Sequence, residues 1–487
     1  MATLTAGFVF DDHVLIVRNE SLRAAAELPG YFTRGTWPRS TIGVADTATY
    51  RPLVLVAFFA IYQAAGAAPA AFHAVNVALH AVNAVLVFLL LRRVGVGNMV
   101  PTVVGAVVFA VHPVHVESVA WVSGITDVLM TSCVLLTLWL YAAPSRWAYA
   151  GALLSSALAM FSKEPAVVLP LLALTHDALL LRRVRWPRVA GLAAVTVFYL
   201  GARRVALGAT MHAPSLSIDA FGRAIDYFLG YVDLTVAPVA AGLFLTPPAR
   251  AVGALGAVTA VAIVAGVAVW SRRDRVAAFG VVLFVATLAP ALSLVFNAGT
   301  TYAQRFLYLP SVAVSLLVAR LPLERWRRAS AAAAVVIVAL AAVSLVGTRP
   351  WRDDGLILEQ AVRNTPEFHG GYASLGLYYE GAGRRDDAAR MYLEAARLAP
   401  PAQRALAYNR LGMMYFAAAD YARAAPAFET AWDLDRTRWD ALYNLGVTLV
   451  RLGRDDEART RFVVFDRGAP REKYAAALAE VRWRLAH

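Results

Sequence analysis

The chain has 487 residues, of which 59% are hydrophobic and only 16% charged, and its mean hydropathy is +0.56. This composition excludes a soluble globular protein and indicates an integral membrane protein. The net charge of +13 does not indicate a nucleic-acid partner, because the arginines cluster in short loops between apolar runs, as the positive-inside rule predicts for a multi-span membrane protein.

The first 350 residues predict an all-α membrane domain preceded by a polar loop. Residues 1–51 are mostly polar and form the predicted outer loop, and residues 52–65 are too few to cross a bilayer, so we predict an interfacial or re-entrant helix there. The remaining apolar runs of the 52–350 domain predict about ten spans, with 224–245 not crossing. The expected spans are 70–91, 98–112, 122–142, 147–162, 165–181, 189–207, 251–270, 276–296, 307–321 and 329–348.

Charge predicts the orientation of these spans. With the arginine-rich loops in the cytoplasm, the N-terminal loop and the C-terminal region both fall on the non-cytoplasmic side. The same count places Met1 outside, so we expect one further span upstream of it. Alanine- and arginine-rich usage with only two lysines suggests a GC-rich bacterial genome, and therefore a bacterial inner membrane with the C-terminal domain in the periplasmic or extracellular space.

Residues 351–487 carry a repeat. Leu-Gly pairs recur at intervals of 36 and 34 residues, at Leu375-Gly376, Leu411-Gly412 and Leu445-Gly446. This spacing is typical of tetratricopeptide (TPR) repeats, in which small residues let paired helices approach closely. We predict a half repeat, three full repeats and a capping helix over about 471–486, stacked into an α-solenoid with a concave peptide-binding surface.

Polar side chains beside the apolar runs are the candidate site, because such groups are costly at membrane depth and often functional. Asp11 and Asp12 suit a general base or a metal ligand, and the alternative is a solvated loop or helix cap. His112, His115 and Glu117 suit zinc or manganese, and equally a sugar, a phosphate or the positioning of a loop.

Two further groups complete the candidates. Lys163 and Glu164 are either a simple ion pair or part of the site, and Arg305 either extends to the membrane surface or binds a lipid phosphate. One face of the first span is polar and either lines a cavity or makes interhelical hydrogen bonds. Its residues are His73, Asn76, His80 and Asn83.

Together these motifs resemble the transmembrane and TPR-repeat-containing O-mannosyltransferase family, a branch of the GT-C glycosyltransferases. The resemblance covers nearly the whole chain, and the ordered set is more specific than any single motif. The motifs are, in order, Phe10-Asp-Asp-His, Tyr50-Arg-Pro-Leu, Phe72-His-x-x-Asn76-x-x-x-His80, Phe109-x-x-His-Pro-x-His-x-Glu117, Phe161-Ser-Lys-Glu164 and Arg305-Phe-Leu-Tyr-Leu-Pro-Ser311.

The resemblance implies an inverting enzyme that transfers mannose or another hexose from a polyprenyl phosphate to protein hydroxyls on the non-cytoplasmic side. It implies Asp11 or Asp12 as the catalytic base, with Arg305 and Lys163 at the donor phosphate. It implies a pocket lined by His112, His115, Glu117, Glu164, His73, His80 and Arg51. Some GT-C enzymes use a divalent metal, so Mg or Mn stays an open alternative to no cofactor.

The expected partners are a polyprenyl-phosphate-linked sugar, membrane lipids, and a polypeptide acceptor or partner in the TPR groove. Two other functions stay open. One is a GT-C transferase that modifies a glycan or lipid while the TPRs recruit a partner. The other is a non-catalytic, membrane-anchored TPR scaffold. Substituting Asp12→Asn separates an enzyme from a scaffold, because a scaffold should keep its full phenotype.

Overall fold

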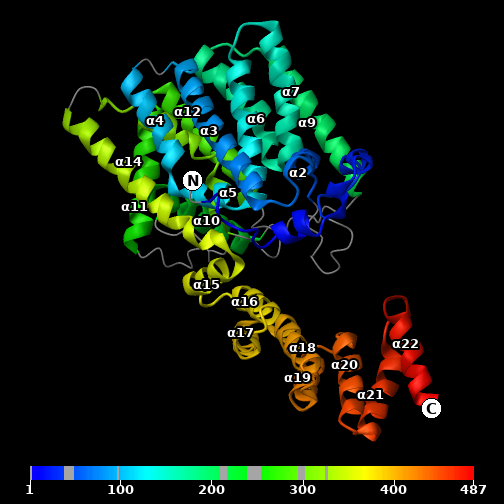
Figure 1. Ribbon diagram of the computed structural model, residues 1–487. Helices are drawn as coiled ribbons and strands as arrows, with labels where there is room; N and C mark the ends of the chain where they lie inside the picture. The colour runs from blue at the N-terminus through cyan, green and yellow to red at the C-terminus, as the bar shows by residue number, and fades with distance from the viewer. Residues whose placement is uncertain are drawn as a thin grey trace. The chain divides into compact units, whose positions relative to one another are not determined.

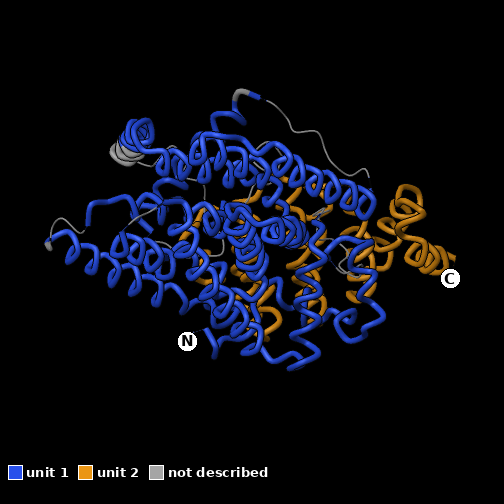
Figure 2. Tube along the Cα trace, turned by 90° about the horizontal axis from the view of Figure 1, so that it is seen from above, with its two compact units in different colours: residues 1–356 blue, residues 357–487 orange. Residues whose placement is uncertain are grey.

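The computed structural model describes residues 3–37, 49–95, 98–208, 217–238, 254–293, 302–323 and 327–486. These residues form α-helices joined by short 3-10 and π-helical segments, which confirms the all-α fold class (Figure 1). The chain divides into two compact units, Met1–Leu356 and Ile357–His487, coloured separately in Figure 2.

Among the described residues, the first unit contains fourteen α-helices, and a fifteenth begins in it. They are α1 (Leu28–Tyr31), α2 (Pro52–Ala65), α3 (Pro69–Arg93), α4 (Met99–Val111), α5 (Val116–Ala120), α6 (Ile125–Tyr141), α7 (Arg146–Ser162), α8 (Leu169–His176), α9 (Trp186–Leu207), α10 (Ile218–Val236), α11 (Ala254–Ser271), α12 (Arg275–Ser293), α13 (Val312–Val318), α14 (Arg327–Gly347) and α15 (Asp354–Asn364).

Six helical segments of the described residues are long and apolar enough to cross a membrane, and a seventh is added if α4 and the bent segment after it count as one span. The bend between Met99–Val111 and Pro113–Ala120 is 43°. The six are Pro69–Arg93, Val122–Tyr141, Glu164–Leu181, Trp186–Leu207, Arg275–Ser293 and Arg328–Arg352. The chain is therefore an integral membrane protein by the length and composition of its helices.

The sequence predicted about ten spans, and the described residues contain only six or seven. The predicted span 307–321 contains only the seven-residue α13, which is about 10 Å long and cannot cross a hydrocarbon core of about 30 Å. The predicted span 147–162 forms α7, whose 17 residues make it slightly shorter than the shortest of the six candidate spans. The first residues of the predicted span 251–270 lie outside the described residues.

Helix α6 is the central element of the first unit. Of its most apolar window, 78% is buried, whereas none of the corresponding window of α14 is buried. Helices α3 and α7 flank α6, and α9 follows α7 (Figure 1). On α4, a Cβ added at Gly105 would lie 2.7 Å from the carbonyl oxygen of Ser315, so glycine allows α4 and α13 to pack closely.

The second unit is built from paired helices. After α15 it contains α16 (His369–Gly381), α17 (Arg385–Leu398), α18 (Pro401–Ala417), α19 (Tyr421–Leu434), α20 (Trp439–Arg451), α21 (Asp455–Gly468) and α22 (Arg471–Ala486). The repeated glycines lie against an aromatic ring of the partner helix. A Cβ would lie 2.8, 2.7 and 2.4 Å from ring atoms for the pairs Gly376–Tyr392, Gly412–Phe428 and Gly446–Phe462.

The last helix, α22, buries Leu478 and Val481, and Tyr474 and Leu485 pack partly buried against the same apolar cluster. These four residues form one apolar face of the helix that the sequence predicted as a capping helix. A helix that covers the end of the stack keeps the last repeat from exposing its apolar side.

The close approach at Gly412 yields a stability prediction. We expect Gly412→Ala to lower the free energy of unfolding of the second unit by about 1–3 kcal/mol, because the added methyl overlaps the buried Phe428 ring. Pulse proteolysis of the full-length protein in urea measures this loss. Gly381→Ala is the control, since its Cβ would meet nothing within 4 Å and alanine favours a helix. Equal stability of the two variants would contradict the proposed packing constraint.

Candidate functional site

The two carboxylates of the acidic pair have different surroundings. Asp12 is fully buried, and its Oδ1 accepts hydrogen bonds from the backbone N–H of Ser123 at 2.9 Å and from the Ser123 hydroxyl at 2.5 Å. Its Oδ2 accepts from the N–H of Val9 at 3.0 Å. Asp11 is partly exposed, and within the described part of the chain its carboxylate has no hydrogen-bond partner. Asp12 therefore anchors the loop, and Asp11 is available to a substrate.

Burial raises the pKa of Asp11 to about 6, against the opposing effect of the positive charges on Arg305 and Arg51. Burial also raises the pKa of Asp12 to about 7, and the hydrogen bonds from Ser123 and Val9 oppose that rise. A carboxylate whose pKa lies near the working pH is suited to accept a proton as a general base. Of the two, Asp11 combines this property with an open position.

Arg305 lies in the 3-10 segment η9 (Gln304–Leu307) and is held by Glu117 of α5. Its Nη1 contacts Glu117 Oε1, and its backbone N–H donates to Oε2 at 2.9 Å. The Glu117 side chain is completely buried, whereas that of Arg305 stays 18% exposed. The guanidinium carbon is 5.5 Å from the centre of the Trp121 ring. Arg305 is thus held in place, and within the described part of the chain its Nε and Nη2 have no hydrogen-bond partner.

Lys163 and Glu164 do not pair with each other, so the simple ion pair considered from sequence is wrong. Lys163 Nζ lies 2.6 and 2.7 Å from the two carboxylate oxygens of Asp127 on α6, and both side chains are about 95% buried. Glu164 instead accepts from Nε and Nη2 of Arg51 at 3.1 and 3.0 Å. The backbone of Lys163 is extended, and neighbouring residues of extended chain point to opposite sides.

These charges act on one another. Arg305 interacts electrostatically with Asp127 and Asp11 as well as with Glu117, and Arg51 acts on both Asp11 and Lys163. The structure therefore brings together residues from five separate stretches of the sequence. We call this set the charged cluster, and it consists of Asp11, Arg51, Glu117, Asp127, Lys163, Glu164 and Arg305.

The polar face of α3 makes hydrogen bonds to neighbouring segments, which is one of the two alternatives left open by the sequence. His80 Nε2 donates to the Ala110 carbonyl at 3.0 Å, so its Nδ1 accepts from the Tyr308 hydroxyl at 2.7 Å. Asn83 Nδ2 donates to that hydroxyl at 3.1 Å. Asn83 Nδ2 also donates to the Val128 carbonyl at 2.9 Å. The other contacts are His73 Nε2 with the Gly7 carbonyl at 3.2 Å and Asn76 Nδ2 with the carbonyls of Trp121 and Val122 at 2.9 and 3.2 Å.

The histidines after α4 are also committed to protein partners. His112 Nε2 lies 3.0 Å from the Thr235 carbonyl oxygen, and His115 Nε2 lies 2.8 Å from Ser311 Oγ. Glu117 is paired with Arg305. Among the described residues no group of three or more His, Cys, Asp or Glu side chains is placed to hold a metal ion. Three of the residues considered as metal ligands, His112, His115 and Glu117, thus hold segments of the chain together.

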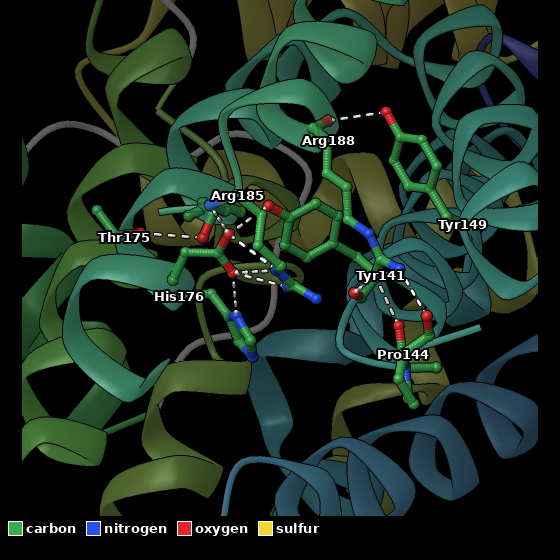
Figure 3. A network of polar contacts seen from close by, with 10 residues as sticks. Tyr141, Pro144, Tyr149, Thr175, His176, Arg185 and Arg188 are labelled. Carbon is green, nitrogen blue, oxygen red and sulfur yellow. Dashed lines mark hydrogen bonds and ion pairs between the residues drawn. The ribbon is translucent and has the colours of Figure 1, made fainter. Parts of the chain in front are cut away.

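A second polar network lies at the other end of α6 (Figure 3). The buried Asp177 carboxylate accepts from the Tyr141 hydroxyl at 2.9 Å and from Arg185 Nη2 at 2.7 Å. Arg188 donates to the carbonyls at the end of α6, including Ala143 at 2.7 Å. Because Asp127 and Tyr141 stand in the first and last turns of α6, about 21 Å separates the two networks. The network in Figure 3 therefore fastens helix ends away from the charged cluster.

Three residues of the site were not assigned a role from sequence. Asp127 pairs with Lys163, Ser123 binds Asp12, and Asp354 contacts the acidic loop. Ser123 and Asp127 belong to the polar stretch 109–127 between two apolar runs. That stretch indicated a functional region, but it did not show which residues these two side chains contact. Asp354 gave no signal, because an acidic residue at a helix start is common as a cap.

Comparison with known proteins adds an independent observation. The Protein O-mannosyl-transferase Tmtc1 of Drosophila melanogaster is 37% identical over 134 residues, which are 28% of this chain and 16% of that protein. The Protein O-mannosyl-transferase F38B6.6 of Caenorhabditis elegans is 25% identical over 426 residues, which are 82% of this chain and 61% of that protein. This chain is a relative of the TMTC-type protein O-mannosyl-transferases.

The second unit agrees with this relationship. A tetratricopeptide repeat family model matches residues 415–481, which include the last helix pair and most of the capping helix. The human Protein O-mannosyl-transferase TMTC1 is 35% identical over 137 residues, or 28% of this chain and 15% of that protein. The chain thus spans less than two thirds of the length of the TMTC-type relatives it matches.

Proposed function

We propose that this chain is an inverting membrane glycosyltransferase that transfers a hexose, mannose in the first instance, from a polyprenyl phosphate to a hydroxyl of a polypeptide. The observation that supports it most is the charged cluster, in which Asp11 has no hydrogen-bond partner among the described residues and shares the field of Arg305. A general base beside fixed cations suits displacement of a phosphate from a sugar carbon. The relationship to TMTC-type proteins supports the same reaction.

In the proposed reaction Asp11 takes the proton from the acceptor hydroxyl while that oxygen attacks the sugar C1. The new C–O bond forms as the bond from C1 to the phosphate oxygen breaks, and the polyprenyl phosphate leaves with the electron pair. One displacement inverts the anomeric carbon, so no sugar–enzyme intermediate is needed. Asp12, bound to Ser123 and Val9, keeps the loop in place during this step.

Arg305 and Lys163 are proposed to stabilise the charge that develops on the leaving phosphate. Each is held by a buried carboxylate, Glu117 for Arg305 and Asp127 for Lys163, so neither cation must reorganise during the reaction. Arginine suits a phosphate because its planar fork can donate two parallel hydrogen bonds. The proposed steps use only side chains of this chain, and they assign no role to a metal ion.

The second unit is proposed to bind the acceptor polypeptide. Leu377 and Met413 follow the Leu-Gly pairs of two successive repeats and are 53% and 45% exposed, which offers apolar contacts at a repeated position. Both units are proposed to work on the non-cytoplasmic side, where the positive-inside pattern places the acidic loop and the C-terminal region.

The test is transfer of radiolabelled mannose from polyprenyl-phosphate mannose to polypeptide by the protein in membranes. We expect kcat/KM to rise with pH through about 6 and then level off, because burial raises the pKa of Asp11 to about 6 and only its carboxylate form accepts the proton. Glu20→Gln, which changes an exposed carboxylate of the same loop, should leave the profile unchanged.

Three other outcomes of this assay would change the proposal. Label found only in a glycan or lipid would replace the polypeptide acceptor in the proposal. Absence of transfer with every polyprenyl-phosphate sugar tried would overturn the enzyme and favour a membrane-anchored TPR scaffold. A pH profile that is flat between 5 and 8 would exclude Asp11 as the base.

A further inference from the structure

The segment that precedes the second unit makes direct contact with the acidic loop. The carboxylate of Asp354, the first residue of α15, accepts a hydrogen bond from the backbone N–H of Phe10 at 2.7 Å. Its other oxygen lies 2.7 Å from Nε2 of His13. One side chain, more than 340 positions away in the sequence, thus holds the residues on both sides of Asp11 and Asp12.

The loop has a backbone that needs such support. Phe10 has a φ of +52°, in the left-handed region that residues other than glycine rarely adopt. Such a conformation is strained and persists only where the surroundings impose it. Ser123 holds Asp12 and Asp354 holds Phe10, so the open carboxylate of Asp11 stands between two fixed points.

The same segment also reaches the support of Arg305. Trp351 is fully buried, and its ring stacks on that of Trp121 with centroids 6.1 Å apart and an interplanar angle of 28°. The Arg305 guanidinium lies over the Trp121 ring. The N–H of Gly7 donates to the Arg352 carbonyl at 2.9 Å. Residues 351–354 therefore contact both the loop of the base and the aromatic ring beneath the cation.

An acidic residue at a helix start is most simply a cap, but Asp353 already serves α15 in that way. Its Oδ1 accepts from the N–H of Leu356 at 3.0 Å. Both oxygens of Asp354 are directed instead to the acidic loop. The two neighbouring carboxylates thus have separate roles.

We propose that Asp354 is a positioning residue that holds the acidic loop so that Asp11 meets the acceptor hydroxyl. Asp354, the loop that it contacts and the Trp351–Trp121 pair all lie within the first unit. The structural part of this proposal stands alone, whereas its catalytic consequence rests on the proposed function.

The experiment compares Asp354→Ala with Asp353→Asn in the full-length protein. Hydrogen–deuterium exchange of the peptide over residues 8–17 should be faster in Asp354→Ala and unchanged in Asp353→Asn, which removes a charge but retains a cap. In the transfer assay, kcat of Asp354→Ala should fall about 100-fold with the KM for the donor unchanged, as expected for a misplaced base. Asp354→Asn, which retains an acceptor for the Phe10 N–H, should recover part of kcat.

The outcomes separate the two proposals. Unchanged exchange of residues 8–17 in Asp354→Ala, with α6 equally protected, would overturn the positioning role whatever the activity. Faster exchange in that variant, together with no transfer by the wild type, would support the positioning role and refute the proposed function. Faster exchange with an unchanged kcat would overturn the catalytic consequence of the contact.

Discussion

We expect Asp11→Asn to lower the rate of the proposed sugar transfer by about 10²–10⁴-fold and to leave the thermal stability of the protein unchanged. The rate falls because an amide cannot take the proton of the acceptor hydroxyl. Stability is kept because the Asp11 carboxylate has no hydrogen bond to lose among the described residues, and asparagine has nearly the same shape. Single-turnover transfer and a thermal unfolding curve, measured on the same preparation, test both statements.

Asp12→Asn is the matched control one residue away. The buried Asp12 accepts three hydrogen bonds, and an amide would direct N–H donors at a donor of Val9 or Ser123. We expect a loss of about 1–3 kcal/mol in stability, because a buried donor is left unsatisfied. Equal loss of transfer in both variants with equal stability would contradict the division of roles, and so would full activity of Asp11→Asn.

We expect Lys163→Met to lower the free energy of unfolding by about 3–5 kcal/mol, because it leaves the Asp127 carboxylate buried without its partner. Both side chains of this pair are about 95% buried, and the two nitrogen–oxygen distances are 2.6 and 2.7 Å. Arg273→Met, at an exposed arginine, should change stability little. Denaturant titration of the purified protein in detergent measures the difference.

The double variant Lys163→Met/Asp127→Asn separates stability from function. It removes both charges, so most of the lost stability should return. Transfer should not return, because the cation proposed for the leaving phosphate is still missing. Recovery of transfer along with stability would show that Lys163 has only a structural role.

Some parts of this protein follow from local sequence. The first span is a long run of mostly apolar residues, and α3 forms over nearly the predicted residues. The Leu-Gly spacing predicted the helix pairs of the second unit, because the repeat places each glycine against the same neighbour. Span number was harder to predict, since 307–321 is apolar enough for a membrane yet forms a short α13 packed against α4 and α12. Hydropathy indicates that a segment is removed from water, but it does not distinguish burial inside the protein from contact with lipid.

The sequence by itself determined that the chain is a helical membrane protein with a TPR region, because apolar run length and repeat spacing are local properties. It also named most members of the charged cluster. Only the tertiary structure decided how they pair: Lys163 with Asp127 rather than Glu164, and Asp12 with Ser123 while Asp11 stays open. Adjacent carboxylates in a sequence are chemically equivalent, and their roles diverge only when distant backbone groups bind one and leave the other free.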